Sequence, residues 1–469
     1  MARDRDGVAA VAWFRMAVCV GWFFLVGCEE ARTASPRIPV LGEVGGQVAR
    51  EGVEAHVWSR TLRVGDPQAP HAVMTSNGDV LVAATYQEPI DLGAGPLPFD
   101  RGVAAPHLLV ARYSPHGALK WAQGWTPRGP ARARVGGVAV DATDHLFLSG
   151  LSAGFTRGGA TLPAGPFLAR LDGAGALDWV RSLPGEGPVA VNAVAAAPDG
   201  GAVLVGDFSG TRDFGEGLKT APGARHAGFA LRVGPQGEQR WSRVWLPVGE
   251  GEVSARAVAV DVFGDVQVVG GYAGAVSFGD ATFLTVRQHT PFVVKLDRDG
   301  DHLWSHDVRG TDGTAVSVAV GPDRVFVGGG FSGRLYFQDT FHQADSRDGF
   351  LLAYDAHGAQ RWARTFPTSA PMVATDEAGQ VTVAGAHDGG HALGGGDLPP
   401  GLYVAKLLPD EGTSLWVRGF ASPGTQANAR TVSVDSSGGV LLAGGLDRPA
   451  SDGGPAPRLQ DGFVLRLNP

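Results

Sequence analysis

Two stretches of sequence decide the fold: residues 255–274 read ARAVAVDVFGDVQVVGGYAG, and residues 292–308 read FVVKLDRDGDHLWSHDV. In both, apolar or small residues alternate with period two on each side of a turn that contains glycine, which is the pattern of a β-hairpin. The two hairpins together predict a unit of four antiparallel strands. The two hairpins are separated by a variable segment, which is longer than a hairpin turn. Ligand-binding residues are often found on such loops.

The unit recurs along the chain, and a tryptophan on its fourth strand marks each repeat. Intervals of 54 to 63 residues separate Trp58, Trp121, Trp179, Trp241, Trp304, Trp362 and Trp416. This spacing predicts seven similar units, with each tryptophan buried. Small residues recur at one position of the first strand, as expected for the crowded inner strand of a radial array with an inert axis: Ala139, Ala195, Ala259, Ala319, Ala374 and Ser433.

The last unit lacks a fourth strand, because the chain ends at Pro469 directly after the third strand, GFVLRLNP. The missing strand is expected at the other end of the chain, in HVWSRTLRV at residues 56–64. Pairing these two segments would remove both exposed sheet edges, which otherwise invite aggregation. The predicted fold class is therefore all-β: a seven-bladed β-propeller with four antiparallel strands per blade, closed by the N-terminal strand around Trp58, which completes the last blade.

The N-terminus has the pattern of a targeting signal. Arg3, Arg5 and Arg15 precede an apolar stretch at residues 16–27, which is too short to span a membrane as a mature helix. It ends in LVGC at residues 25–28, which resembles the lipobox of bacterial lipoproteins, whose cysteine is lipidated. An ordinary signal peptide with an incidental cysteine is the alternative.

This reading divides the chain into three parts. We predict a lipoprotein signal peptide at residues 1–27, a flexible tether at residues 28–50 that begins with the lipidated Cys28, and the propeller at residues 51–469. The lipid places the protein in the cell envelope, with the membrane as a partner. Glu29 follows the cysteine in place of the aspartate that retains many lipoproteins in the inner membrane, so the outer membrane is favoured.

Composition excludes several classes of protein. With 44% hydrophobic and 18% charged residues, the 469-residue chain is too apolar for extended disorder. Its formal net charge of −8 and its lack of basic runs argue against a nucleic-acid partner. The two cysteines, Cys19 and Cys28, both lie in or next to the apolar segment, so a disulfide framework and a cysteine-based metal site are excluded.

The repeats resemble a known type. Units such as VDVFGDVQVVGGYAGAVSFGDATF, followed by FVVKLDRDGDHLWSHDV, and AAPDGGAVLVGDFSGTRDFGEGL, followed by GFALRVGPQGEQRWSRVW, share a D-x-x-G-type turn, a glycine-containing second strand and a terminal tryptophan after the third strand. They resemble the seven-bladed β-propeller (SBBP-type) repeats of predicted bacterial surface and secreted proteins, over about residues 52–469. The resemblance implies a rigid, anchored disc that presents a surface, and no catalytic residue set comes with it.

Four local patterns suggest chemistry without the context that it needs. Ser152 in GLSAG matches a nucleophile elbow, and Gly328–Gly333 matches G-x-G-x-x-G, but neither segment leads into a helix. The acidic turn at Asp297 lacks the order of an EF-hand, and the His387–His391 pair lies in a glycine-rich loop. We therefore predict no catalytic residue, no cofactor and no metal site.

The predicted function is a lipid-anchored, non-enzymatic binding or scaffolding module of the cell envelope. Its partner would be a protein or a glycan, and the protein itself would be a monomer. Arg212, Asp213 and Arg225, in the long loop at residues 209–228, are the candidate ligand-rim residues. One alternative is an enzyme of lyase or dehydrogenase type at the mouth of the central channel, which requires titratable side chains from several blades to converge there. The other is an envelope-assembly component.

Overall fold

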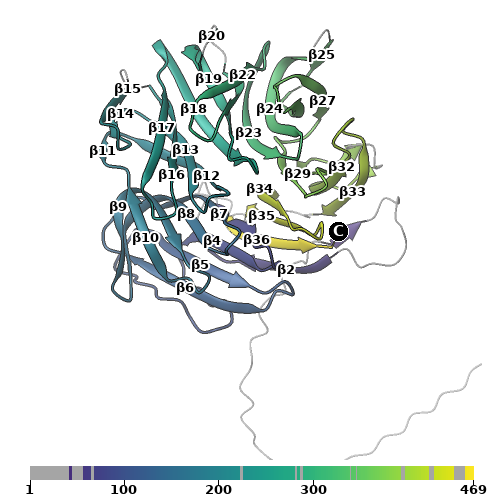
Figure 1. Cartoon of the computed structure of the whole chain (residues 1–469). Coiled ribbons are helices and arrows are strands. Elements are labelled where there is room, and N and C mark those ends of the chain that lie inside the picture. Colours follow the sequence, from purple (N-terminus) through teal and green to yellow (C-terminus); the bar gives the residue numbers. More distant parts are fainter. Residues whose placement is uncertain are drawn as a thin grey trace, which may run out of the picture. The chain divides into compact units, whose positions relative to one another are not determined.

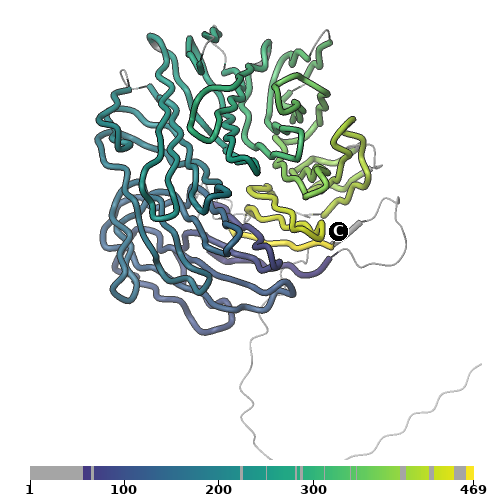
Figure 2. The backbone as a smooth tube through the Cα atoms, viewed as in Figure 1, coloured from purple at the N-terminus to yellow at the C-terminus, as the bar shows by residue number. Residues whose placement is uncertain are grey.

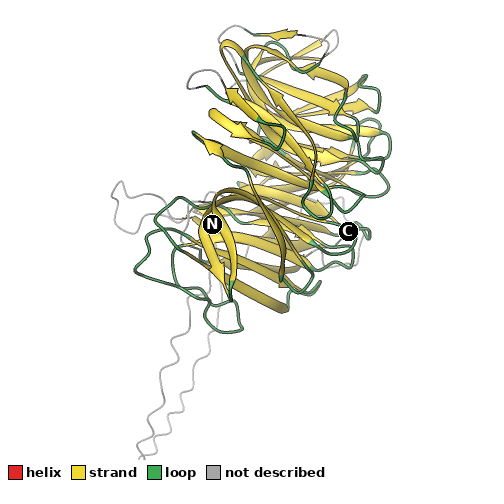
Figure 3. Ribbon diagram, turned by 60° about the vertical axis from the view of Figure 1, so that its left-hand side comes forward, coloured by secondary structure: helices red, strands yellow, loops and turns green. Residues whose placement is uncertain are grey.

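Every regular element in the described part of the chain is a β-strand (Figure 3). The computed structural model describes residues 42–44, 56–64, 68–221, 225–279, 282–285, 289–337, 340–344, 346–391, 397–421, 427–447 and 460–468. Within these ranges there is no helix with the length and apolar character needed to cross a membrane. The prediction of an all-β fold is confirmed.

The strands follow one another in antiparallel groups of four, numbered here in chain order, and groups 1 and 2 are joined in one sheet because β6 also pairs with β8. Groups 1 to 3 contain β3 (His71–Met74), β4 (Val80–Tyr86), β5 (His107–Tyr113) and β6 (Leu119–Pro127); β7 (Arg134–Val140), β8 (Leu146–Arg157), β9 (Ala160–Leu171) and β10 (Leu177–Ser182); and β12 (Val189–Ala196), β13 (Ala202–Phe208), β16 (Ala227–Val233) and β17 (Gln239–Trp245). Groups 4 and 5 contain β18 (Val248–Val260), β19 (Val266–Ser277), β21 (Thr290–Leu296) and β22 (His302–Asp307); and β23 (Thr311–Val320), β24 (Arg324–Phe337), β26 (Asp348–Asp355) and β27 (Gln360–Phe366).

Groups 6 and 7 complete the series. They contain β28 (Met372–Thr375), β29 (Val381–His387), β32 (Gly401–Leu407) and β33 (Ser414–Ala421); and β34 (Ala427–Val434), β35 (Val440–Asp447), β36 (Gln460–Leu467) and β2 (His56–Leu62). Short additional strands lie beside the groups: β1 (Gly42–Val44), β11 (Gly185–Glu186), β14 (Gly210–Asp213), β15 (Leu218–Ala221), β20 (Thr282–Leu284), β25 (Thr340–Gln343), β30 (Gly390–His391) and β31 (Asp397–Leu398).

The first strands of the groups contact one another in a closed sequence. β3 packs against β7, and the contacts continue through β12, β18, β23, β28 and β34 back to β3 (Figure 1). The two ends of the described fold meet in group 7, where β2 pairs antiparallel with β36 and places Ser59 opposite Leu465 (Figure 2). The Trp58 segment therefore supplies the fourth strand of the last group, as its sequence predicts.

The hydrophobic core lies between neighbouring groups. Val203 and Val205 of β13 belong to one buried cluster with Val266 and Val268 of β19. Alternation with period two gives each strand two faces, and the second and third strands are buried on both, as β13 and β16 show. This explains why the repeats contain so many small and β-branched residues.

A fourth-strand tryptophan reaches into the next group at six of the seven positions. Its indole Nε1–H donates to a backbone carbonyl in the turn between the third and fourth strands there: Trp58 to Pro115 at 2.9 Å, Trp121 to Gly173 at 3.2 Å, Trp179 to Pro235 at 2.8 Å, Trp241 to Arg298 at 2.9 Å, Trp304 to Ala356 at 3.1 Å and Trp362 to Pro409 at 2.7 Å. The prediction that all these tryptophans are buried is wrong for Trp121, Trp179, Trp304 and Trp416, which are partly exposed. The repeated residue is needed for this contact between groups as well as for burial.

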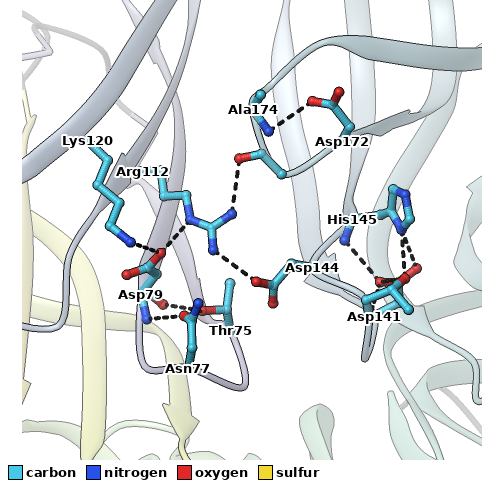
Figure 4. A network of polar contacts seen from close by, with 12 residues as sticks. Thr75, Asn77, Asp79, Arg112, Lys120, Asp141, Asp144, His145, Asp172 and Ala174 are labelled. Carbon is cyan, nitrogen blue, oxygen red and sulfur yellow. Dashed lines mark hydrogen bonds and ion pairs between the residues drawn. The ribbon is translucent and has the colours of Figure 1, made fainter.

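Ion pairs join the first turn to the third strand in five of the seven groups, at the same end of the fold as the tryptophan contacts. A basic residue of the third strand bonds to the aspartate of the first turn in Arg112–Asp79, Arg232–Asp199, Lys295–Asp261, Lys406–Asp376 and Arg466–Asp435. Figure 4 shows the first of these, where Arg112 also donates to Asp144 of group 2 at 3.0 Å and Lys120 approaches Asp79 at 2.6 Å. The network joins two groups and is part of the scaffold.

A short strand that precedes the seven groups in the sequence belongs to the same compact unit as they do. β1, inside the segment predicted as a flexible tether, pairs antiparallel with the outer edge of β33 and places Val44 opposite Gly419. An unpaired outer strand offers free backbone groups, and a preceding piece of chain can satisfy them. Cys28 and the predicted signal peptide lie outside the described residues.

Candidate functional site

A polar cavity of about 170 Å³ opens at the end of the fold where the first strands begin. Groups 2, 3 and 4 supply most of its lining, and group 5 adds Thr314. A volume of this size exceeds the space of a single water many times. We call it the Asp207 pocket, and the residues that matter below are Arg134, Asn192, Asp207, His226, Glu252, Ser254, Arg256 and His289.

β-Bulges in the first strands expose several of these side chains. Pairing between first and second strands skips one residue in group 3, in group 4 and in group 7, and the skipped residues are Asn192, Arg256 and Arg430. A bulge leaves its extra residue unpaired and turns the side chain out of the regular alternation. Groups 2 and 5 have bulges at the same position, where the skipped residues are Gly136 and Val316. In groups 3, 4 and 7 this position has a polar side chain instead.

Asp207, at the end of β13, is the centre of the pocket's hydrogen bonds. Its Oδ1 accepts from Asn192 Nδ2 at 2.9 Å and from Ser254 Oγ at 2.6 Å. Asn192 Nδ2 also donates to the carbonyl of Ala255 at 2.9 Å, which ties group 3 to group 4. The carboxylate is buried, with 7% of the residue exposed. Such bonds orient a carboxylate for a fixed partner.

Two histidines each stand beside a carboxylate at the pocket. His226 Nδ1 lies 3.3 Å from Asp207 Oδ2, which is an ion-pair distance without hydrogen-bond geometry. His289 Nε2 lies 3.0 Å from Glu252 Oε1. Both histidines directly precede the third strands of their groups, β16 and β21, and both side chains are exposed to solvent, so they are accessible to a ligand in the pocket.

Three arginines from different groups form a cationic cluster at the same end. Burial lowers the pKa of Arg134, with nearby Asp207 opposing and Arg256 adding to the effect. Burial also lowers the pKa of Arg430, and the charges of Arg134 and Arg256 lower it further. These effects place the three guanidinium groups within one another's field. Arginine nevertheless stays protonated at neutral pH.

His71 completes the cluster from group 1. Burial lowers its pKa well below the usual value, and the charges of Arg430 and Arg134 add to this effect. A neutral His71 can accept at Nε2, and Arg430 Nε lies 3.4 Å from that atom. The contact orients Arg430, which is accessible to water although protein surrounds it.

The arginine cluster is incompletely neutralised. Arg134 donates from Nη2 to the carbonyl of Val191 at 2.8 Å and to Asn192 Oδ1 at 3.0 Å, while its buried Nε has no hydrogen-bond partner. Among the described residues, Arg256 makes no hydrogen bond or ion pair, and its side chain is exposed. Arg134 and Arg256 line the pocket, and Arg430 adds a third positive charge near them, against the two carboxylates Asp207 and Glu252. An anionic group therefore gains from binding here.

The pocket can bind a polar ligand and has groups capable of proton transfer. Carboxylates accept hydrogen bonds from hydroxyls, amide and guanidinium groups donate them, and the histidines do either. The described residues include no group of three or more His, Cys, Asp or Glu side chains placed to hold a metal ion.

The predicted rim residues lie elsewhere. Arg212, in β14, is buried, and its guanidinium donates to the carbonyls of Leu183 at 2.9 Å and Gly187 at 2.8 Å, so it holds the loop in place. Asp213 Oδ1 accepts from the backbone N–H of Gly215 at 2.6 Å. Arg225 is exposed at the base of the same loop. The structure does not bring these three residues into the Asp207 pocket.

The other motifs have structural roles. Ser152 is buried, and its Oγ accepts from the backbone N–H groups of Gly154 and Phe155. Asp297 Oδ1 accepts from Asp299 N at 2.9 Å and Asp301 N at 2.8 Å, as expected for a turn. His387 is buried at the end of β29.

Sequence reasoning missed the Asp207 pocket, and the expectation of an inert axis is wrong at this end of the fold. Small residues do occupy the inner strands, but the bulge residues lie three positions before them. Asn192, Arg256 and Arg430 precede Ala195, Ala259 and Ser433 by this spacing. A polar residue repeated at a fixed offset from a small one was the available signal.

Comparisons with known proteins add little. No protein-family model matches the sequence, and no curated protein matches it. Among solved structures, hydrazine synthase of Kuenenia stuttgartiensis matches 82% of this chain and 97% of its own, with 10% identity and a TM-score of 0.47. Polysaccharide lyase Uly1 matches 86% of this chain and 90% of its own, with 11% identity and a TM-score of 0.47. A gluconolactonase of Xanthomonas campestris matches 71% of this chain and 89% of its own, with 16% identity and a TM-score of 0.35. At such identities and TM-scores, these similarities carry no argument about the ligand or the activity.

Proposed function

We propose that the seven groups are the blades of a β-propeller of the SBBP type. The closed sequence of contacts among the first strands supports this, and so does the pairing of β2 with β36. The indole of Trp58, which lies in group 7, donates to group 1 as five other tryptophans donate to the next group along. A closed ring leaves no terminal blade with an open face.

We further propose that Cys28 is lipidated and anchors this propeller in the cell envelope, with the outer membrane favoured. The support is the LVGC tetrapeptide at the end of a short apolar stretch. Two or more acyl chains would give stable anchoring, whereas one chain is marginal.

The anchor is tested by replacing Cys28 with alanine in cells. We expect Cys28→Ala to move the protein from the membrane fraction to the soluble fraction, while Cys19→Ala leaves it in the membrane. Retention of the Cys28→Ala protein in membranes would show that the cysteine is not the anchor.

We propose that the anchored propeller is a binding protein whose ligand site is the Asp207 pocket, and that the ligand is a glycan. The observation that carries this is the convergence of Asp207, Asn192 and Ser254 from separate strands on one polar cavity. A cavity lined by carboxylates, amides and guanidinium groups suits a hydroxyl-rich ligand better than an apolar one. The open mouth at the end of the first strands would admit part of a larger glycan.

Binding is tested with a panel of neutral and acidic oligosaccharides and the full-length protein in detergent. We expect one glycan class to bind and Asp207→Asn to abolish that binding. Glu238→Gln is the matched control, because Glu238 is an exposed carboxylate in the turn between β16 and β17, at the opposite end of group 3. A panel without any binder, or equal loss in both variants, contradicts the proposal.

A second candidate function is an enzyme at the same pocket. The specific observation in its favour is the pair of histidine–carboxylate contacts, His226 with Asp207 and His289 with Glu252. A carboxylate beside a histidine can orient it and stabilise its protonated form, as general acid–base catalysis requires.

Turnover separates the two functions. If the protein is an enzyme of lyase type, a bound glycan will gain new reducing ends over time, and His226→Gln will stop their formation while binding persists. If the protein is a binding module, the glycan stays intact during prolonged incubation with the wild type.

A further inference from the structure

Building on the proposed function, we infer that the pocket selects a sugar with a single acidic group, and that Arg134, Arg256 and Arg430 bind that group. Arg134 and Arg256 line the cavity from groups 2 and 4. Arg430 is not part of the lining, but it is the bulge residue of group 7, at the position that Arg256 has in group 4, and its charge acts on both. The ligand class is therefore narrower than glycans in general. It is an acidic sugar, such as a uronate, attached to neutral sugars.

Neither Arg134 nor Arg256 forms an ion pair with a carboxylate among the described residues. The basic residues of the third strands differ in this respect, as Arg466 meets Asp435 at 2.6 Å. Arg256 has no such partner among the described residues, and the buried Nε of Arg134 is unpaired. Like charges placed together in a partly desolvated site repel one another, so an incoming anion relieves an existing cost.

The contact between His71 and Arg430 supports the inference that the arginines bind an anion. His71 is buried, and it can accept from Arg430 without adding a charge, because it is neutral. A carboxylate at that position would neutralise Arg430 and remove its attraction for a ligand. A neutral acceptor orients the guanidinium and keeps the charge available.

The two carboxylates limit how much negative charge a ligand can bring. Asp207 and Glu252 line the same cavity as Arg134 and Arg256, each beside a histidine. They would repel closely spaced negative charges and accept hydrogen bonds from neutral hydroxyls. A ligand with one acidic group can place that group at the arginines and its neutral hydroxyls at the carboxylates, and so bind both kinds of side chain. A densely charged polyanion cannot do so.

The test compares three probes by calorimetry with the full-length protein in detergent. They are a disaccharide of one glucuronate and one neutral hexose, the same disaccharide with its carboxyl reduced to an alcohol, and inorganic sulfate. We expect the acidic disaccharide to bind about tenfold or more tightly than its reduced form, since hydrogen bonds to charged groups are the stronger ones. Sulfate should bind weakly.

The variants assign the preference to the arginines. Arg256→Gln and Arg430→Gln should each lower the affinity for the acidic disaccharide more than the affinity for its reduced form, so that the preference between the two shrinks. Arg298→Gln is the matched control: Arg298 is an exposed arginine in the turn between β21 and β22, at the opposite end of group 4. Arg256 has no structural partner among the described residues, so its replacement should not affect folding, and circular dichroism checks this.

The outcomes distinguish this inference from the proposed function. Equal affinity for both disaccharides, with Asp207→Asn abolishing both, overturns the role of the arginines and leaves the glycan site standing. If sulfate binds as tightly as the acidic disaccharide, the claim that the ligand is a sugar is wrong, and the pocket is a general anion site. Binding of none of the three probes overturns the inference for uronates, and the wider panel then decides whether the pocket binds glycans.

Discussion

Asp144 has a left-handed backbone conformation, with φ of 67°, and among the described residues it is alone in this apart from glycines. It lies in the first turn of group 2, where the corresponding turns have glycines such as Gly200 and Gly264. The conformation disfavours a residue with a Cβ, although aspartate tolerates it better than most. Its carboxylate accepts from Arg112 Nη2, and this bond offsets part of the cost (Figure 4).

Substitutions at Asp144 separate the two effects. Asp144→Ala loses the ion pair and keeps the unfavourable backbone, so we expect it to lower the unfolding free energy by about 1 to 2 kcal/mol. Asp144→Gly also loses the pair but relaxes the backbone, and should be more stable than the alanine variant by about 1 kcal/mol. Urea denaturation measures both values. Equal stability of the two variants would mean that the backbone here carries no strain.

At the scale of the element, the repeated first turn is a small polar unit that ends each first strand. In group 7, Asp435 Oδ1 accepts from the backbone N–H groups of Ser437 and Gly439, and Oδ2 accepts from Arg466 Nη2 at 2.6 Å. Burial alone would raise the pKa of Asp435. The bonds from Ser437, Gly439 and Arg466 outweigh burial and lower it.

This shift makes the turn sensitive to acid. A carboxylate with a pKa below its unfolded value of about 3.9 contributes stability above that value, and the contribution is lost as the pH falls through the folded-state pKa. We expect wild-type thermal stability to fall steeply below about pH 4. Asp435→Asn should be less stable than wild type at pH 7 and approach it at pH 3. A constant difference between the two proteins at both values would exclude this role of Asp435.

At the scale of the whole molecule, the closed circle depends on a contact between its last group and its first. Trp58 of β2 packs against Tyr113 with ring centroids 5.9 Å apart and donates to Pro115. Gly117 lies directly over the indole, where a side chain would collide with it. This contact joins group 7 to group 1, so its loss should weaken the entire circle rather than one group.

We therefore expect Trp58→Ala to lower the unfolding free energy by about 3 to 5 kcal/mol. Trp304→Ala, at an internal contact, should cost less, because Trp304 is partly exposed whereas Trp58 is only 8% exposed. Trp58→Phe retains most of the packing but loses the hydrogen bond, at a cost of about 1 kcal/mol. A melting temperature of Trp58→Ala equal to that of wild type would mean that β2 does not close the fold.

The sequence by itself determined the strands, the four-strand unit and the pairing of the Trp58 segment with the last strand. These follow from alternation, turn residues and a repeated tryptophan, which are local patterns or regular intervals. The same reasoning predicted an inert axis and placed the candidate ligand residues at Arg212, Asp213 and Arg225.

Only the tertiary structure decided where the candidate site lies. Arg134, Asp207, Arg256 and Arg430 belong to four different segments, and their neighbourhood depends on the order of the groups around the circle and on the bulges that turn side chains out of the strands. A bulge shifts the alternation by one residue, so a position that reads as part of a regular strand points elsewhere. Charge clustering is likewise a property of distances in space, and residues far apart in the chain acquire it only once the ring of strands has closed.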